Sequence, residues 1–178
     1  MSRAIKPGYP PEQSARASVV KRLAGRIFGF EQELEELRQQ IRELSWDAPF
    51  GMWTRGAFLR FCHVMPRSLR MVAFIDLEDI KGLNKRYGYT EVDRRVKAMF
   101  SVPFRRSDVV ARWYSGDEIV ILFDSDRDGA ERKMVELEQS ACAQGLKFRY
   151  EIGTWEVGKQ GIEEAIDQLS YQVVIQKP

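Results

Sequence analysis

Two adjacent carboxylates, Asp117 and Glu118, offer the clearest chemistry in the sequence. They follow a Ser-Gly pair and separate two apolar runs, 109–113 and 119–123, that are typical of paired β-strands. A tight hairpin would place both acids at its tip, and clustered carboxylate oxygens suit a hard divalent cation. The alternative is an ordinary polar turn, which this sequence also fits. Another acid close to the hairpin would favour the metal site.

Such an acid is Asp76, which ends the apolar run 71–75. A continuous apolar run of this kind is typical of a central strand that is buried on both faces. If this strand lies beside the hairpin, Asp76 comes close to Asp117 and Glu118. Three carboxylates on neighbouring strand ends can hold the metal ions that steer phosphoryl or nucleotidyl transfer. The residues alone therefore predict metal-dependent nucleotide chemistry.

The elements that must position these acids follow from periodicity and from turn residues. Helices are predicted at 55–64, 79–87, 90–100, 127–144 and 162–172, and a further strand is predicted at 147–155. Gly88 and Gly145 are expected to end helices, and Thr90 is expected to N-cap one. The order is strand, two helices, hairpin, helix, strand, helix. This order predicts an α+β, ferredoxin-like fold, with helices on one face of a sheet that contains antiparallel strands.

The N-terminal part has a different pattern. Residues 1–17 contain three prolines and are predicted to be a flexible leader. Residues 18–45 are predicted to form a helix whose apolar residues alternate steps of three and four: Val20, Leu23, Ile27, Phe30, Leu34, Leu37, Ile41 and Leu44. This heptad stripe favours a parallel coiled-coil homodimer through 20–44, and the alternative is a helix packed on its own domain. The globular domain is then 46–178.

Composition limits the class of protein. The chain has 178 residues, 44% of them apolar and 30% charged, which is typical of a soluble globular protein. A net charge of only +2 argues against a dedicated nucleic-acid binder. Cys62 and Cys142 lack metal-ligand spacing, so reduced thiols are expected. No apolar run is long enough to span a membrane or to form a signal peptide. We expect a cytoplasmic protein with no nucleic-acid or membrane partner.

Four motifs, in the same order, resemble those of the GGDEF domain of diguanylate cyclases, which join two GTP molecules into cyclic di-GMP. DAPFGMWTRGAF at 47–58 is similar to DxLTGLxNRRxF, and DLEDIKGLNKRYGYTEVD at 76–93 is similar to DxDxFKxxNDxxGHxxGD. RRSD at 105–108 resembles the RxxD inhibitory site, and SGDEI at 115–119 stands where GGDEF is expected. The resemblance covers 47–171 and implies a palm of the nucleotidyl cyclase type.

The resemblance implies roles for the acids. Asp76 and Asp117 would bind Mg²⁺ or Mn²⁺, with the backbone carbonyl of Leu77 as a further ligand. Glu118, beside Asp117, would help to activate the attacking 3′-hydroxyl of GTP. The enzyme would be a nucleotidyltransferase that acts as a dimer.

It also implies substrate-binding residues. Asn84 and Asp93 would recognise the guanine edge, because an Asp accepts hydrogen bonds from guanine N–H groups and an Asn both donates and accepts. Lys81, Ser115 and Gly116 complete the implied nucleotide site. Without the resemblance, the residues themselves favour a solvated helix surface for Asn84 and Lys81, and for Asp93 an acid that interacts favourably with a helix N-terminus.

Arg105 and Asp108 would form an inhibitory site for cyclic di-GMP, although the segment between Asp108 and the SGDEI sequence is one residue longer than in the family. The extra residue follows Arg112, where it is predicted to reverse the facing of a strand or to require a bulge.

The chain also departs from the family at three single positions. They are Ser115, Ile119 and Val174, the last of which stands where a phosphate-binding Lys is expected. Lys177 is a possible substitute for that Lys. Two functions therefore remain open. One is a working diguanylate cyclase, or a cyclase with a related cyclic dinucleotide or oligonucleotide product. The other is a degenerate, shortened domain that binds GTP or cyclic di-GMP as a signalling module.

Overall fold

The structure is a computed structural model that describes residues 29–41, 43–114 and 116–175. The chain divides into two compact units, Met1–Glu43 and Leu44–Pro178. Residues 29–41 are helical, and the stripe residues Phe30, Leu37 and Ile41 are exposed on them. The predicted leader and the first three stripe positions lie outside the described residues. The coiled coil therefore stays a prediction, which the exposed stripe supports.

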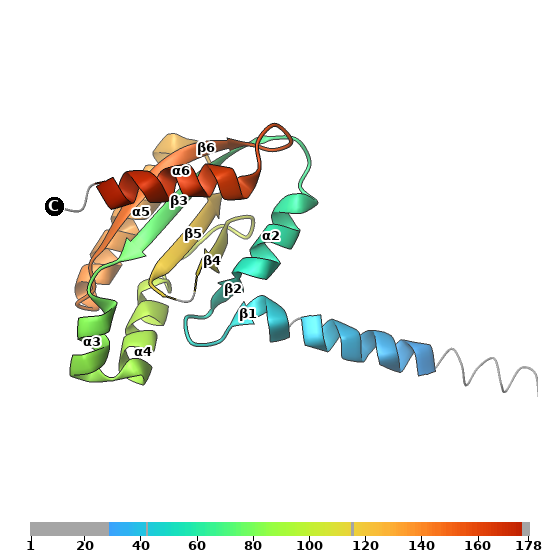
Figure 1. Ribbon diagram of the computed structural model, residues 1–178, viewed down its shortest axis with the longest axis horizontal. Coiled ribbons are helices and arrows are strands. Elements are labelled where there is room, and N and C mark those ends of the chain that lie inside the picture. The colour runs from blue at the N-terminus through green and yellow to red at the C-terminus, as the bar shows by residue number, and fades with distance from the viewer. Residues whose placement is uncertain (1–28, 42, 115, 176–178) are drawn as a thin grey trace, which may run out of the picture. The chain divides into compact units, whose positions relative to one another are not determined.

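In the described residues of the second unit, Figure 1 labels six strands and five helices. They are β1 (Trp46–Asp47), β2 (Met52–Thr54), α2 (Arg55–His63), β3 (Leu69–Leu77), α3 (Ile80–Tyr87), α4 (Tyr89–Met99), β4 (Val109–Arg112), β5 (Glu118–Phe123), α5 (Arg127–Ala143), β6 (Phe148–Glu156) and α6 (Ile162–Ile175). The predicted α+β class is confirmed.

The six strands form one sheet in the order β1-β2-β4-β5-β3-β6. β3 lies between β5 and β6 and is antiparallel to both, whereas β2 and β4 pair in parallel. The apolar run predicted as a central strand is therefore central. Its carboxyl end, with Asp76, lies beside the beginning of β5.

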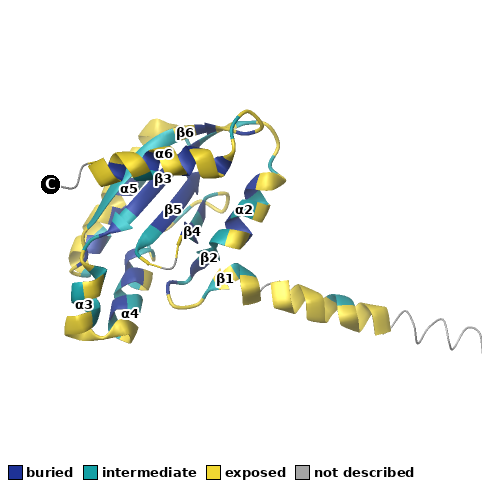
Figure 2. Cartoon of the chain, viewed as in Figure 1, coloured by how far each residue is buried: buried dark blue, intermediate teal, exposed yellow. Residues whose placement is uncertain are grey.

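Helices cover both faces of this sheet, so the prediction of helices on one face is wrong. Ala73 and Ile75 of β3 pack in a core with α4 and α5, while Val72 and Phe74 pack in a second core with α2 and α6. Figure 2 shows the central strands as buried and the outer sides of the helices as exposed. A strand that is apolar on both faces requires such cover on both, because each exposed apolar face would cost hydration free energy.

Local sequence explains how α3 follows β3. Asp79 adopts a left-handed conformation (φ 52°), and its side chain accepts a hydrogen bond from the Gly82 N–H at 3.1 Å. Gly88 has φ 83°, ends α3 as predicted, and also precedes α4, which has no side-chain cap. The prediction of Thr90 as an N-cap is wrong, because α4 already begins at Tyr89.

Both cysteines are free thiols. Burial raises the pKa of Cys62 to about 12, whereas Cys142 is exposed. In the part of the chain that the structure describes, no helix has the length and apolar character needed to cross a membrane.

Candidate functional site

The predicted hairpin is formed by β4 and β5. Its pairing is regular up to Arg112 opposite Ile119, and the Trp113 N–H donates a hydrogen bond to the Glu118 carbonyl at 2.8 Å. The loop therefore spans 114–117, within which Ser115 lies outside the described residues. The extra residue after Arg112 is accommodated in this loop, so the predicted bulge or reversed facing does not occur in the paired strands.

The end of β3 lies directly beside the start of β5. Asp76 is paired with Glu118 in register, and directly opposed residues of antiparallel strands project from the same face with Cβ atoms about 5 Å apart. The next residue along β3, Leu77, donates its N–H to the Asp117 carbonyl at 2.9 Å. The backbone thus brings all four predicted metal and catalytic positions to one corner of the sheet.

Beside this corner, a pocket of about 410 Å³ lies between α3, α4 and the hairpin loop. Five of the predicted site residues line it: Lys81, Asn84, Asp93, Gly116 and Asp117. Asp76, Leu77 and Glu118 do not line the pocket. The site therefore has two parts, which meet where Asp117, the last residue of the loop, precedes Glu118.

Asn84 lines this pocket and has a hydrogen-bond acceptor that is not used. Its Oδ1 atom is buried and has no hydrogen-bond partner among the described residues. A buried polar atom without a partner is costly, and an N–H group of a ligand would relieve that cost. Asp93, from the next helix, supplies an acceptor that lines the same pocket. Together the two side chains fit a heterocycle that carries adjacent N–H donors.

Five further residues line the pocket that the sequence reasoning did not assign to the site: Phe50, Ile80, Lys85, Tyr89 and Arg112. Helical spacing could have identified Lys85, since it lies four residues after Lys81 and residues at this separation share a helix face. These two lysines give the pocket a cationic side on α3. Such a side suits an anionic ligand.

Arg112 holds the loop in place. Its Nη1 donates to Asp47 Oδ2 at 3.1 Å, its Nη2 donates to the Gly116 carbonyl at 3.0 Å, and its guanidinium lies 4.1 Å from the centre of the Phe50 ring. An acid in the first motif, Asp47, and an arginine immediately before the hairpin loop, Arg112, were the sequence signal for this contact. Arg112 therefore links the first motif to the loop that carries Asp117.

We expect Arg112→Ala to lower the free energy of unfolding by about 1–3 kcal/mol, because it removes a partly buried ion pair and a loop hydrogen bond. Denaturant unfolding measures this. Arg132→Ala removes the same charge from an exposed position on α5 and should leave stability unchanged. Equal stability of the two variants would contradict the role of Arg112.

The oxygen donors at the sheet corner match a divalent cation only as a small set. Among residues 29–41, 43–114 and 116–175, no three side chains of His, Cys, Asp or Glu are grouped closely enough to hold a metal. The predicted cluster of three carboxylates is therefore not formed by the described side chains. Mg²⁺, however, is commonly held by one or two carboxylates together with substrate phosphates and water. Asp76, Asp117 and the Leu77 carbonyl fit that smaller set.

Arg105 and Asp108 lie close together, at the other end of β5 from Asp117. The Arg105 N–H donates to Asp108 Oδ2 at 3.0 Å, and the Asp124 N–H donates to Asp108 Oδ1 at 2.9 Å. The Arg105 side chain donates to the Asp124 carbonyl at 2.6 Å. Burial raises the pKa of Asp108, against the opposing effect of the Arg105 hydrogen bond. In this conformation both residues stabilise a turn.

Known structures resemble this chain along most of its length. The coiled coil and GGDEF domain of DgcB from Caulobacter crescentus, in complex with c-di-GMP, is 18% identical with a TM-score of 0.74, and the match covers 90% of this chain and 94% of that chain. Diguanylate cyclase SiaD from Pseudomonas aeruginosa, in complex with its activator SiaC, is 19% identical with a TM-score of 0.62, covering 92% and 69%. The FimX GGDEF domain from Pseudomonas aeruginosa is 15% identical with a TM-score of 0.60, covering 74% and 91%.

These likenesses confirm the predicted palm fold. No curated protein matches the chain. The family model described as "Diguanylate cyclase, GGDEF domain" matches residues 62–158, which is more than half of the 178-residue chain. That segment contains β3, both helices of the pocket and the hairpin. The chain therefore belongs to the GGDEF domain family.

Proposed function

We propose that the protein condenses two GTP molecules into cyclic di-GMP, with release of pyrophosphate, and that it acts as a homodimer through residues 20–44. The observation that carries this proposal is the pocket in which Asn84 and Asp93 lie together with Asp117, directly beside the sheet corner of Asp76 and Glu118. Such an arrangement holds a base at one end and a phosphate chain at the other.

The base is bound between α3 and α4. The Asp93 carboxylate accepts hydrogen bonds from guanine N1–H and N2–H₂, and the Asn84 amide contacts the guanine edge. Adenine carries no N–H at its N1 position, so the acceptor on Asp93 disfavours it. This gives the site its preference for GTP.

The phosphate chain extends from the pocket towards the corner of the sheet. Gly116 leaves room for it, since a Cβ atom placed there would meet no other atom within 4 Å. Lys81 and Lys85 of α3 also line the pocket and contribute positive charge. Asp76, Asp117 and the Leu77 carbonyl would hold Mg²⁺ or Mn²⁺, which when bound neutralises charge that develops on the phosphate oxygens.

The reaction forms a bond between the 3′-oxygen of one GTP and the α-phosphorus of the other. The bond from that phosphorus to the bridging oxygen breaks, and pyrophosphate leaves with its electron pair. Glu118 lies at the corner where the 3′-hydroxyl must lose its proton, and it takes part in that transfer. A second, reciprocal attack closes the ring.

Each domain presents one GTP, so two domains must face each other. The exposed apolar residues of the N-terminal helix supply a dimer contact. Holding two substrates in register converts a bimolecular step into an effectively intramolecular one, which supplies a large part of the acceleration.

Inhibition by the product would involve another site. Arg105 and Asp108 are the proposed contact for cyclic di-GMP there.

A binding module without turnover is the second candidate. The last turn of α6 carries no basic residue, and Val174 in that turn is exposed. Lys177, the possible substitute, lies outside the described residues. A domain without a cation for the phosphates on the described part of α6 could bind nucleotide and signal without catalysis. GTP or cyclic di-GMP would then be its ligand.

The two candidates differ in pyrophosphate release. Purified dimer incubated with GTP and Mg²⁺ or Mn²⁺ should release pyrophosphate and form a cyclic product that mass spectrometry detects. A confirmed dimer that binds GTP and releases no pyrophosphate would overturn the enzyme and support the module.

Replacing Asp93 with Ala should mainly reduce the preference for guanine. We expect the apparent affinity for GTP to fall about 10- to 100-fold, because hydrogen bonds to a charged acceptor are lost, while the affinity for ATP stays unchanged. Competition binding with the two nucleotides measures this. Asp167→Ala, at an exposed position of α6, is the matched control. An equal loss for both nucleotides would exclude base recognition by Asp93.

A further inference from the structure

Arg149 of β6 lies in a position that the motifs do not explain. β3 pairs with β5 on one side and with β6 on the other. Asp76 of β3 lies directly opposite Glu118 in the first pairing and directly opposite Arg149 in the second. Glu118, Asp76 and Arg149 therefore form a row across β5, β3 and β6 and project from one face of the sheet. The predicted metal ligand Asp76 has a carboxylate on one side and a guanidinium group on the other.

The Arg149 side chain is held, but its hydrogen-bonding capacity is only partly used. Its Nε donates to Glu78 Oε1 at 2.6 Å, and 26% of the side chain is exposed. Its Nη1 atom is screened from solvent and has no hydrogen-bond partner among the described residues. A guanidinium that is held through its Nε can still donate hydrogen bonds from both Nη groups to a planar oxyanion. A small rotation about the Glu78 contact would direct these groups to such an anion.

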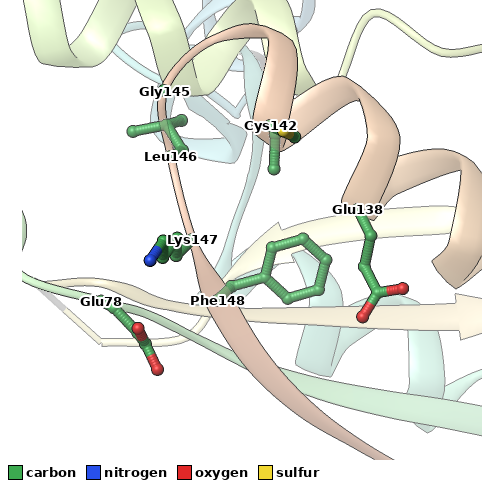
Figure 3. Close-up of a pocket in the computed structure, with 8 residues that line it drawn as sticks. Glu78, Glu138, Cys142, Gly145, Leu146, Lys147 and Phe148 are labelled. Carbon is green, nitrogen blue, oxygen red and sulfur yellow. The ribbon is translucent and has the colours of Figure 1, made fainter.

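Glu78 has other surroundings that would retain it if Arg149 turned away. It lines a pocket of about 470 Å³ between the end of α5 and the start of β6. Figure 3 shows Lys147 at the same end of this pocket as Glu78, with Phe148 between them and Glu138. The Glu78 N–H is also bonded to the Lys147 carbonyl at 2.8 Å. The backbone at Glu78 is thus held independently of the Arg149 side chain.

The same face of the sheet is covered by α6, whose last turn lacks a basic residue. We propose that Arg149 binds the phosphate chain of the nucleotide at the Asp76 corner and supplies from β6 the positive charge that α6 does not provide. This inference rests on nucleotide binding by the proposed site, but not on turnover. Its ligand is the polyphosphate and not the base.

The test compares a ligand with a full phosphate chain and one with a single phosphate. The probes are GTP with a methylene group between the α- and β-phosphorus, which cannot release pyrophosphate, and GMP, both in the presence of Mg²⁺. We expect Arg149→Ala to weaken binding of the triphosphate about 10- to 100-fold and binding of GMP less than threefold, because one charge-assisted contact to the chain is lost. Arg149→Lys should recover part of the loss, because it keeps the charge without the planar pair of donors.

Arg132→Ala is the matched control, and circular dichroism with thermal unfolding checks that each variant folds. Equal weakening of both ligands, or no weakening of either, would overturn the role of Arg149. Binding by the unaltered protein separates this inference from the proposed function. If it binds the triphosphate without turning over GTP, only the enzyme is excluded. If it does not bind the triphosphate, both proposals fail.

Discussion

Asp117→Asn is expected to reduce pyrophosphate release from GTP by about 10³-fold, the scale seen when one group that stabilises transition-state charge is removed. Asn has nearly the same shape as Asp but no negative charge, so it weakens metal binding while the loop can keep its conformation. The Leu77 N–H bonds to the backbone carbonyl at position 117 and not to the side chain, and the substitution leaves that contact in place.

The measurement is steady-state pyrophosphate release over a range of Mg²⁺ or Mn²⁺ concentrations. Asp167→Asn makes the same chemical change at an exposed position of α6 and should keep full activity. GTP binding measured without metal should be similar in both variants. Unchanged turnover in Asp117→Asn would exclude this carboxylate from the metal site.

Replacing Leu34 and Leu37 together with Lys is expected to yield monomers that bind GTP but do not cyclise it. Two charges on the apolar stripe remove the burial that holds a coiled coil together and repel their counterparts on the other helix. A monomer no longer holds a second GTP next to the first, so the high effective concentration of the second substrate is lost. Turnover should therefore fall at least about 10³-fold.

The control is a double change of Gln32 and Gln39 to Lys, which adds the same charge at exposed positions on the side of the helix away from the stripe. Light scattering gives the oligomeric state, and GTP binding shows that the globular domain is intact. A monomer with full activity would remove dimerisation from the mechanism. A stable dimer of the stripe variant would place the contact elsewhere.

Much of the fold follows from local sequence. The apolar run of β3, the glycine that ends α3 and the two strands of the hairpin were all predictable, because each depends on neighbours in the chain. β1 and β2 were missed, since strands of two and three residues in a Pro- and Gly-containing segment carry no periodicity. They are held to the sheet by the pairing of β2 with β4 and by the contact between Asp47 and Arg112, which are 65 residues apart in the chain.

The cover on both faces of the sheet was implied by the β3 sequence itself. This strand has Val72 and Phe74 on one side and Ala73 and Ile75 on the other, so exposing either face to water would cost hydration free energy. The prediction of helices on one face ignored this consequence. The helices α2 and α6 fill the second face although they lie at opposite ends of the domain sequence.

The site was predictable as a set of residues but not as an arrangement. Spacing could indicate that Asn84 and Asp93 lie on consecutive helices, and that Asp76 meets the hairpin. It could not show that Asp117 lines the pocket while Asp76 and Glu118 share the adjacent sheet face, because that division depends on the register of β3 and β5. Arg149 was missed for the same reason, since only the register of β6 places it beside Asp76.

The proposed condensation is tested most directly by the composition of its product. The dimer is incubated with Mg²⁺ or Mn²⁺ and an equal mixture of unlabelled and uniformly ¹⁵N-labelled GTP, and the product is resolved by mass spectrometry. If two GTP molecules are joined at random, half of the cyclic di-GMP carries one labelled and one unlabelled guanine. A protein that binds GTP but gives no such mixed product, or gives only products that contain a single guanine, would contradict the assignment as a diguanylate cyclase.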